Sequence, residues 1–141
     1  MYMLGLLLVT LECGVFAYFL KEAKMFVRCV FFKGHIKAGM HEFFHDYWKE
    51  NLVPLWSNFP HLLELRVLAE VESDDIGNPF PLVLSMKFNS RDDIAEALAS
   101  SVRWASKETS KGLLDMFDGD VIHTVFSADQ FDLSLGKVHN L

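Results

Sequence analysis

Residues 38–56, AGMHEFFHDYWKENLVPLW, are the stretch around which the rest of the chain can be arranged. Apolar and aromatic side chains recur through it at helical spacing, and Gly39 precedes the run, so the pattern predicts an amphipathic helix. Pro54 lacks a backbone N–H, and we therefore expect the helix to end or kink near Leu52. At about 100° per residue, the predicted buried face carries Met40, Phe43, Phe44, Tyr47, Asn51 and Leu55.

The flanking segments predict four strands and a second helix. Residues 26–33, 62–72, 80–88 and 121–127 have the β-branched, aromatic or alternating character of strands. Ser90 and Asp93 form a capping box that opens a helix over residues 91–107, and a further helical turn is expected over residues 113–117. The order βαββαβ predicts an α+β domain with a ferredoxin-like, four-stranded antiparallel sheet. Both helices would cover one face, so we expect a homodimer through the open sheet face.

Composition limits the classes of partner. The chain has 141 residues and a net charge of −6, and its lysines are scattered, which argues against nucleic acid and anionic membrane surfaces. The two cysteines, Cys13 and Cys29, have no partner spacing, so buried free thiols are the simpler interpretation. Thirteen phenylalanines suggest a large apolar cavity, a dimer interface, or both.

The first residues raise a separate question, because residues 2–20 are apolar apart from Thr10 and Glu12. A secretory signal would need a basic start and a cleavage site, and Glu12 would be costly in lipid. We expect a hydrophobic extension, residues 1–24, packed as a helix or swapped onto a neighbour, with Met25 as a candidate natural start; a membrane anchor is the alternative. The domain would then span residues 25–128, followed by a tail over residues 129–141, in a cytoplasmic protein.

The motif HEFFH, His41 to His45, satisfies H-E-x-x-H, which can place two zinc-binding imidazoles one helical turn apart with Glu42 as general base. The longer metzincin pattern fails, since Trp48 stands where glycine is needed and Asn51 where histidine would be. Both histidines fall at the edge of the predicted buried face. Zinc hydrolysis is therefore kept as a weaker alternative, and we expect no metal.

Other polar groups on this helix point to a pocket. Asn51 falls within the predicted apolar face, where its amide needs a backbone partner or a ligand. Tyr47 would carry its hydroxyl into the same region, and Trp48 would form a wall. On the last strand, His123 is either a core histidine or the group that meets Tyr47 near neutral pH. We take Tyr47 and His123 as candidate catalytic residues, and Trp48 and Asn51 as candidate substrate-binding residues.

Arg28, Arg66 and Lys87 lie on predicted strands, where solvated or dimer-facing salt bridges would explain them. No Ser-His-Asp order, nucleotide-binding glycine loop or cofactor-binding cysteine occurs, so acyl transfer by a triad and phosphoryl transfer lose support. We expect no cofactor.

The run Phe44, Tyr47, Trp48, Pro54 and Leu55 resembles the first helix of the EthD-like family of dimeric α/β barrels. Phe59-Pro60, the segment from Phe88 to Asp92, ALASS at 97–101, and Phe117-Asp118 resemble later parts of that family, so the resemblance spans about residues 25–127. It implies a ferredoxin-like protomer whose sheets pair across a two-fold axis, with a pocket between sheet and helices.

One departure affects the expected activity: Leu52 stands where that family usually has a helix histidine. We count Leu52 with the candidate substrate-binding positions. The resemblance implies an isomerase, cyclase, lyase or monooxygenase that acts without cofactor on a hydrophobic, carbonyl-bearing substrate. The alternative is a dimeric ligand-binding or accessory protein that has lost catalysis.

Overall fold

The computed structural model describes residues 4–11, 14–21, 23–131 and 133. It divides into two compact units, of which the larger is Phe26–Phe126 and the smaller joins Met1–Met25 to Ser127–Leu141. The larger unit contains most of the four-stranded sheet, the helices and the candidate site.

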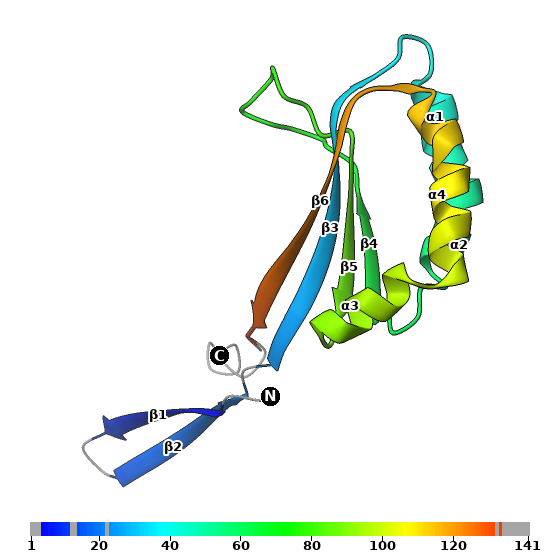
Figure 1. Cartoon of the computed structure of the whole chain (residues 1–141). Helices are drawn as coiled ribbons and strands as arrows, with labels where there is room; N and C mark the ends of the chain where they lie inside the picture. The colour runs from blue at the N-terminus through cyan, green and yellow to red at the C-terminus, as the bar shows by residue number, and fades with distance from the viewer. Residues whose placement is uncertain (1–3, 12–13, 22, 132, 134–141) are drawn as a thin grey trace. The chain divides into compact units, whose positions relative to one another are not determined.

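Four strands form the main sheet in the order β4-β5-β3-β6 (Figure 1). They are β3 (Ala23–Ile36), β4 (Glu64–Leu68), β5 (Leu82–Phe88) and β6 (Phe117–Gln130). β5 pairs antiparallel with both β3 and β4, and Arg28 lies opposite Met86 in the first of these ladders. The predicted α+β class and antiparallel sheet are confirmed, although β4 is shorter than residues 62–72 and β6 is longer than residues 121–127.

The first helical segment is continuous in space but changes type along its length. It comprises α1 (His41–Tyr47), a π-helical turn η1 (Trp48–Leu52) and α2 (Val53–Trp56). A proline ring clashes with the carbonyl four residues earlier in an α-helix, and the wider π turn directly before Pro54 relieves that crowding. The expected kink near Leu52 is thus a π turn, and the helix continues to Trp56.

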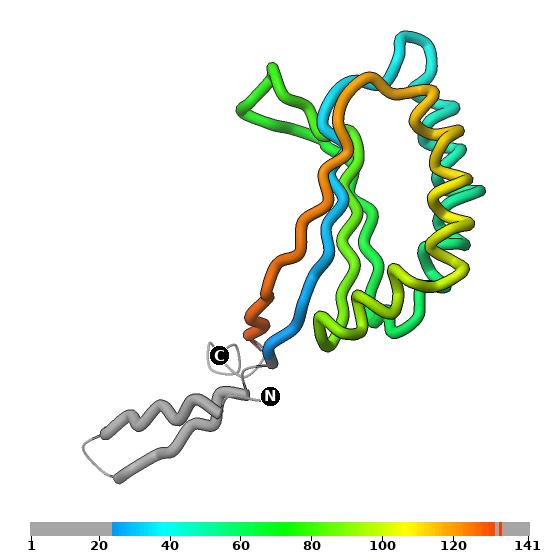
Figure 2. Tube along the Cα trace, viewed as in Figure 1, coloured from blue at the N-terminus to red at the C-terminus, as the bar shows by residue number. Residues whose placement is uncertain are grey.

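The second helical region consists of α3 (Arg91–Leu98) and α4 (Ser101–Leu114), where we expected one helix and a separate turn. Ser90 Oγ accepts a hydrogen bond from the Asp93 backbone N–H, as the capping box predicts. Ser100 Oγ accepts one from the Arg103 N–H and so caps a second helix directly after the first. Figure 2 shows the helices along one face of the sheet, and within the described residues of the larger unit no helix lies on the opposite face.

The helical segment buries one stripe, at a spacing of four residues. Its members pack with the sheet in one core: Phe44, Trp48, Leu52 and Trp56. The predicted buried face was wrong in part, since Phe43 is 66% exposed and Asn51 is exposed. The expectation assumed a uniform α-helix, whereas the π turn widens the helix at Trp48 and carries the apolar stripe through Leu52 to Trp56.

Strands β3 and β6 approach each other closely at a pair of glycines. Gly34 has φ +149° and Gly119 has φ +157°, which side chains rarely adopt. A Cβ on Gly34 would lie 2.2 Å from the backbone oxygen of Asp118, and one on Gly119 would lie 2.2 Å from that of Lys33. Glycine at both positions allows this approach of the two backbones.

The N-terminal residues form strands where we expected a helix. β1 (Leu4–Leu11) pairs antiparallel with β2 (Gly14–Lys21), with Leu11 opposite Gly14. Leucine is the most frequent residue of the two strands, which also contain two Val, one Thr, two Phe and one Tyr, residue types that favour strands. Among the residues that the structure describes, no helix is long and apolar enough to cross a membrane.

Candidate functional site

A cavity of about 220 Å³ lies between the helix-facing side of the sheet and the helical segments α2 and α4. Side chains alternate between the two faces of a strand, so alternate residues of β3, β5 and β6 supply its floor. Most of its lining is apolar: Val30, Phe32, Trp56, Phe59, Leu84, Met86, Leu114 and Val121. Its polar members are Arg28, Arg103, Ser106, Lys107, Ser110 and His123.

Arg28 is the most deeply buried of the charged side chains in this lining, with 7% of its surface exposed. Among the described residues, no hydrogen bond or ion pair joins its guanidinium to another side chain. Burial, with a further contribution from the nearby charge of Arg103, lowers the pKa of Arg28 to about 10. The guanidinium remains protonated at neutral pH and brings an uncompensated positive charge into an apolar cavity.

His123 also lines this cavity from β6, and the residue as a whole is exposed to solvent. Burial of its ring, followed by the charges of Arg28 and Arg103, lowers the pKa of His123 from its ordinary value of 6.5. At neutral pH the imidazole is therefore neutral. A neutral imidazole can accept a proton from a bound molecule, and the two guanidinium charges make this one a weaker base than a free imidazole.

A buried hydrogen bond fixes one wall of the cavity. Trp56 Nε1 donates to Ser106 Oγ at 3.2 Å, and this bond joins α2 to α4. Ser110 Oγ donates to the Ser106 carbonyl at 2.7 Å, one turn further along α4. The Trp56 indole and the two serine hydroxyl groups thus have hydrogen-bond partners. The bond between Trp56 and Ser106 fixes α2 relative to α4.

The structure separates the two candidate catalytic residues. His123 lines the cavity, but Tyr47 does not. The Tyr47 hydroxyl donates to the Thr109 carbonyl of α4 at 2.8 Å, and its ring packs against Gly112 so tightly that a Cβ there would lie 2.2 Å from the hydroxyl. This arrangement joins two helices, and it does not place Tyr47 beside His123.

The candidate substrate-binding residues also lie outside this lining. Trp48 and Leu52 are buried in the core, and Leu52 has no exposed surface. The Asn51 amide is exposed and donates to the Tyr47 carbonyl at 3.1 Å, which is the backbone partner that its amide needed. Asn51 and Tyr47 line a separate, open hollow on the outer side of the helix.

The H-E-x-x-H residues do not form a ligand cluster. His41 and Glu42 are exposed, and His45 Nδ1 accepts a hydrogen bond from Trp48 Nε1 at 3.2 Å. Among the described residues, the only group of three His, Cys, Asp or Glu side chains close enough to hold a metal lies elsewhere. The motif therefore has no third ligand within the described part of the chain.

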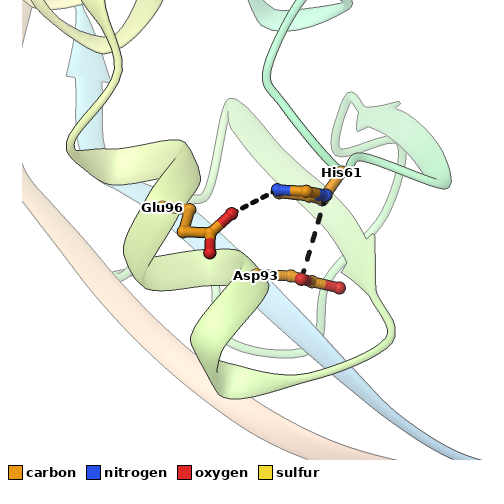
Figure 3. A group of neighbouring side chains, drawn as sticks. All are labelled: His61, Asp93 and Glu96. Carbon is orange, nitrogen blue, oxygen red and sulfur yellow. Dashed lines mark hydrogen bonds and ion pairs between the residues drawn. The ribbon is translucent and has the colours of Figure 1, made fainter.

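That other group consists of His61, Asp93 and Glu96 (Figure 3). His61 Nε2 lies 2.5 Å from a Glu96 carboxylate oxygen, and His61 Nδ1 lies 3.8 Å from one of Asp93. His61 has φ +64°, an unusual conformation for a residue other than glycine. The two ring nitrogens already face the two carboxylates, so these contacts join the loop before β4 to the first turns of α3.

Sequence reasoning missed Arg28 and Arg103. We expected Arg28 in a solvated or dimer-facing salt bridge, and the structure instead places it on the helix-facing side of the sheet. The signal was available, because Arg28 is two residues from Val30 and four from Phe32 and so shares their face. Arg103 had no comparable signal, since its position depends on where α4 begins.

Comparisons with known proteins bear on the fold. No family model matches the sequence, and neither does any curated protein. Hydroxynitrile lyase from Passiflora edulis is similar over 77% of this chain and 96% of its own, with 14% identity and a TM-score of 0.57. An EthD family protein from Bacillus halodurans is similar over 74% of this chain and 98% of its own, with 13% identity and a TM-score of 0.56.

A protein from Bacteroides fragilis, described as dimeric and of ferredoxin-like fold, matches over 74% of this chain and 96% of its own. Its identity is 14% and its TM-score 0.56. The chain has the ferredoxin-like fold. The resemblance to the EthD-like family is confirmed at that level, and at these identities the likeness carries no activity.

Proposed function

We propose that the protein is a small-molecule enzyme, without a cofactor, that moves a proton on a hydrophobic, carbonyl-bearing substrate in the cavity. The reaction would belong to the isomerase, cyclase, lyase or monooxygenase type. His123 would act as the general base and then return the proton. The observation that carries this proposal is the position of His123, which lines a mostly apolar cavity together with Arg28 and Arg103.

The surrounding charges suit that chemistry. Removal of a proton next to a carbonyl leaves an enolate, whose oxygen carries the negative charge. Arg28 and Arg103 would stabilise that charge in a cavity whose lining is mostly apolar. Ser106 and Ser110 already have hydrogen-bond partners, so we assign them to the walls of the site. The fold of the hydroxynitrile lyase supports an enzyme of this general type.

Deuterium exchange tests the proposal. Acetophenone and 4-acetylbenzoate would be incubated with the protein in D₂O, and loss of the acetyl methyl signal would be followed by proton NMR. We expect exchange above the buffer rate, and at least a tenfold loss in His123→Asn. His35→Asn is the matched control, because His35 is exposed and does not line the cavity. Equal exchange rates in the two variants would contradict the role of His123.

A second candidate function is a ligand-binding or accessory protein without catalysis. The position that carries histidine in the resembling family is Leu52 here, and Leu52 is fully buried outside the cavity lining. Binding of the same probes without any deuterium exchange would favour this second function.

We further propose a homodimer that forms through the open sheet face. That face carries an aromatic cluster in which the Phe31 ring lies 6.0 Å from Phe80 and 6.4 Å from Phe126. Phe126 is 45% exposed, and Leu68 nearby on β4 is 49% exposed. Exposure of such an apolar face to water is unfavourable, and a second copy of the chain would bury it. The match to a protein described as dimeric supports a dimer.

Light scattering after gel filtration tests the dimer. Phe126→Glu places a charge on the open sheet face and should convert the dimer to a monomer. Phe43→Glu is the matched control, since Phe43 is a still more exposed aromatic residue but lies on α1. A monomeric parent protein, or a dimer that survives Phe126→Glu, would contradict the proposal.

A further inference from the structure

The lining of the cavity is positively charged in a chain that is acidic as a whole. The sequence has 19 Asp and Glu residues against 13 Lys and Arg, yet the residues that line this cavity include Arg28, Arg103 and Lys107 and no carboxylate. Lys107 is exposed, and its ammonium group lies 5.4 Å from the centre of the Trp104 ring. Arg28 and Arg103 are therefore the cations of the lining that we consider for binding an anion.

The burial of Arg28 is stronger evidence for an anion site than the excess of cations in the lining. A buried guanidinium without a hydrogen-bonded or ionic partner is unfavourable, and it is normally compensated by a carboxylate or a backbone carbonyl. Among the described residues none is bonded to it, and Arg103 adds a like charge. No side-chain nitrogen or oxygen of these residues is both fully enclosed and without a partner, so the guanidinium of Arg28 opens onto the cavity that it lines. A negatively charged ligand in the cavity would compensate this charge.

We infer that the substrate carries a carboxylate, bound by Arg28 and Arg103, on a small hydrophobic body that fills the rest of the cavity. This inference rests on the proposed function and names its substrate class. A guanidinium presents two parallel N–H groups that match the two oxygens of a carboxylate. The apolar floor and walls, among them Phe32, Leu84 and Met86, suit an aromatic or aliphatic body.

The charges that act on His123 come from two elements, namely Arg28 on β3 and Arg103 on α4. Lys107 of α4 lines the same cavity. A bound carboxylate would offset the arginine charges that disfavour the imidazolium form. Binding should therefore raise the pKa of His123 from its lowered value, an effect that a neutral ligand would not produce.

Calorimetry with matched probes tests the inference. Benzoate and benzamide have nearly the same shape, and only benzoate carries a charge at neutral pH. We expect benzoate to bind at least tenfold more tightly than benzamide, and NMR titration to show the pKa of His123 rising with benzoate alone. Equal affinities for the two probes would overturn the carboxylate assignment, as would tighter binding of inorganic phosphate than of benzoate.

Substitutions locate the site. Arg28→Gln and Arg103→Gln should each lower benzoate affinity at least tenfold and leave benzamide affinity within threefold. Arg66→Gln removes the same charge from an exposed arginine that pairs with Glu64 on β4, and it should leave both affinities unchanged. Thermal unfolding checks that each variant folds. If Arg28→Gln does not fold, the half-buried Arg103 decides the outcome, and unchanged benzoate binding by Arg103→Gln overturns the inference.

The two proposals fail in different ways. Preferential benzoate binding without deuterium exchange of either ketone would support the carboxylate site and contradict the proposed enzyme activity. Exchange of acetophenone that depends on His123, without preferential binding of benzoate, would contradict the carboxylate site and support the proposed enzyme activity.

Discussion

Gly34 of β3 and Gly119 of β6 lie so close together that a Cβ on Gly34 would be 2.7 Å from the Gly119 Cα atom. The atoms in the way belong to the backbone, which cannot rotate aside as a flexible side chain can. This close approach lies toward the beginning of β6, the strand that further along carries His123 into the cavity.

Alanine at either glycine should therefore destabilise the fold. We expect Gly119→Ala and Gly34→Ala each to lower the free energy of unfolding by about 2–4 kcal/mol, from steric conflict and backbone strain together. Urea unfolding measures the change. Gly77→Ala is the matched control, because a Cβ there meets nothing nearer than 3.8 Å. Equal stability of the three variants would contradict the close approach.

Tyr47→Phe separates a structural role from a chemical one. The variant loses the hydrogen bond from the Tyr47 hydroxyl to the Thr109 carbonyl, so we expect a loss of about 1 kcal/mol in stability. Deuterium exchange should stay within twofold of the parent rate, since Tyr47 does not line the cavity. A tenfold fall in exchange with unchanged stability would instead restore Tyr47 as a catalytic residue.

Leu52→His should not create an active site. Leu52 is fully buried in the core, and an imidazole there would have to be accommodated without water. We expect a loss of about 2–5 kcal/mol in the free energy of unfolding, as for other severe changes in a packed core. Leu52→Met nearly conserves the volume and should cost less than about 1.5 kcal/mol. A stable Leu52→His protein with new exchange activity would contradict both expectations.

The stability of the protein should fall as the pH falls from 7.5 to 5. Burial lowers the pKa of His123 and of His45 from 6.5 in the folded protein. The unfolded chain therefore takes up these protons at a higher pH than the folded chain does, and acid favours unfolding in this range. Urea unfolding at both pH values should show a smaller fall for His123→Asn than for the parent protein. His35→Asn again serves as the control.

Local sequence signals predicted the elements well where one residue decided the outcome. Ser90 caps a helix through Asp93 as its spacing indicates, and Pro54 perturbs the helix close to the expected point. The order of strands and helices followed, and with it the fold. The break between α3 and α4 was missed because the sequence allows Ser100 to continue a helix. In the structure Ser100 has an extended backbone, and its side chain accepts a hydrogen bond from the Arg103 N–H.

The candidate site was predicted less well, for two physical reasons. The helical wheel assumed a constant rotation per residue, so Asn51 was assigned to the buried face that Leu52 occupies. Arg28 was assigned to solvent because a buried charge is rare, although its alternation with Val30 gave the correct face. Contacts such as those of His61 with Asp93 and Glu96 depend on a loop conformation that no local pattern specifies.

The π turn at Trp48–Leu52 also affects how the chain is aligned with its structural relatives. A π turn accommodates one residue more than an α-helical turn, so residue-by-residue matching across it can slip by one position against a protein with a regular helix. The counterpart of the family histidine would then be Asn51 or Val53 rather than Leu52. The sequence has no histidine between His45 and His61, so the helix lacks that group in every such alignment. Under the proposed function, the proton acceptor would instead be His123 of β6, which lines the cavity.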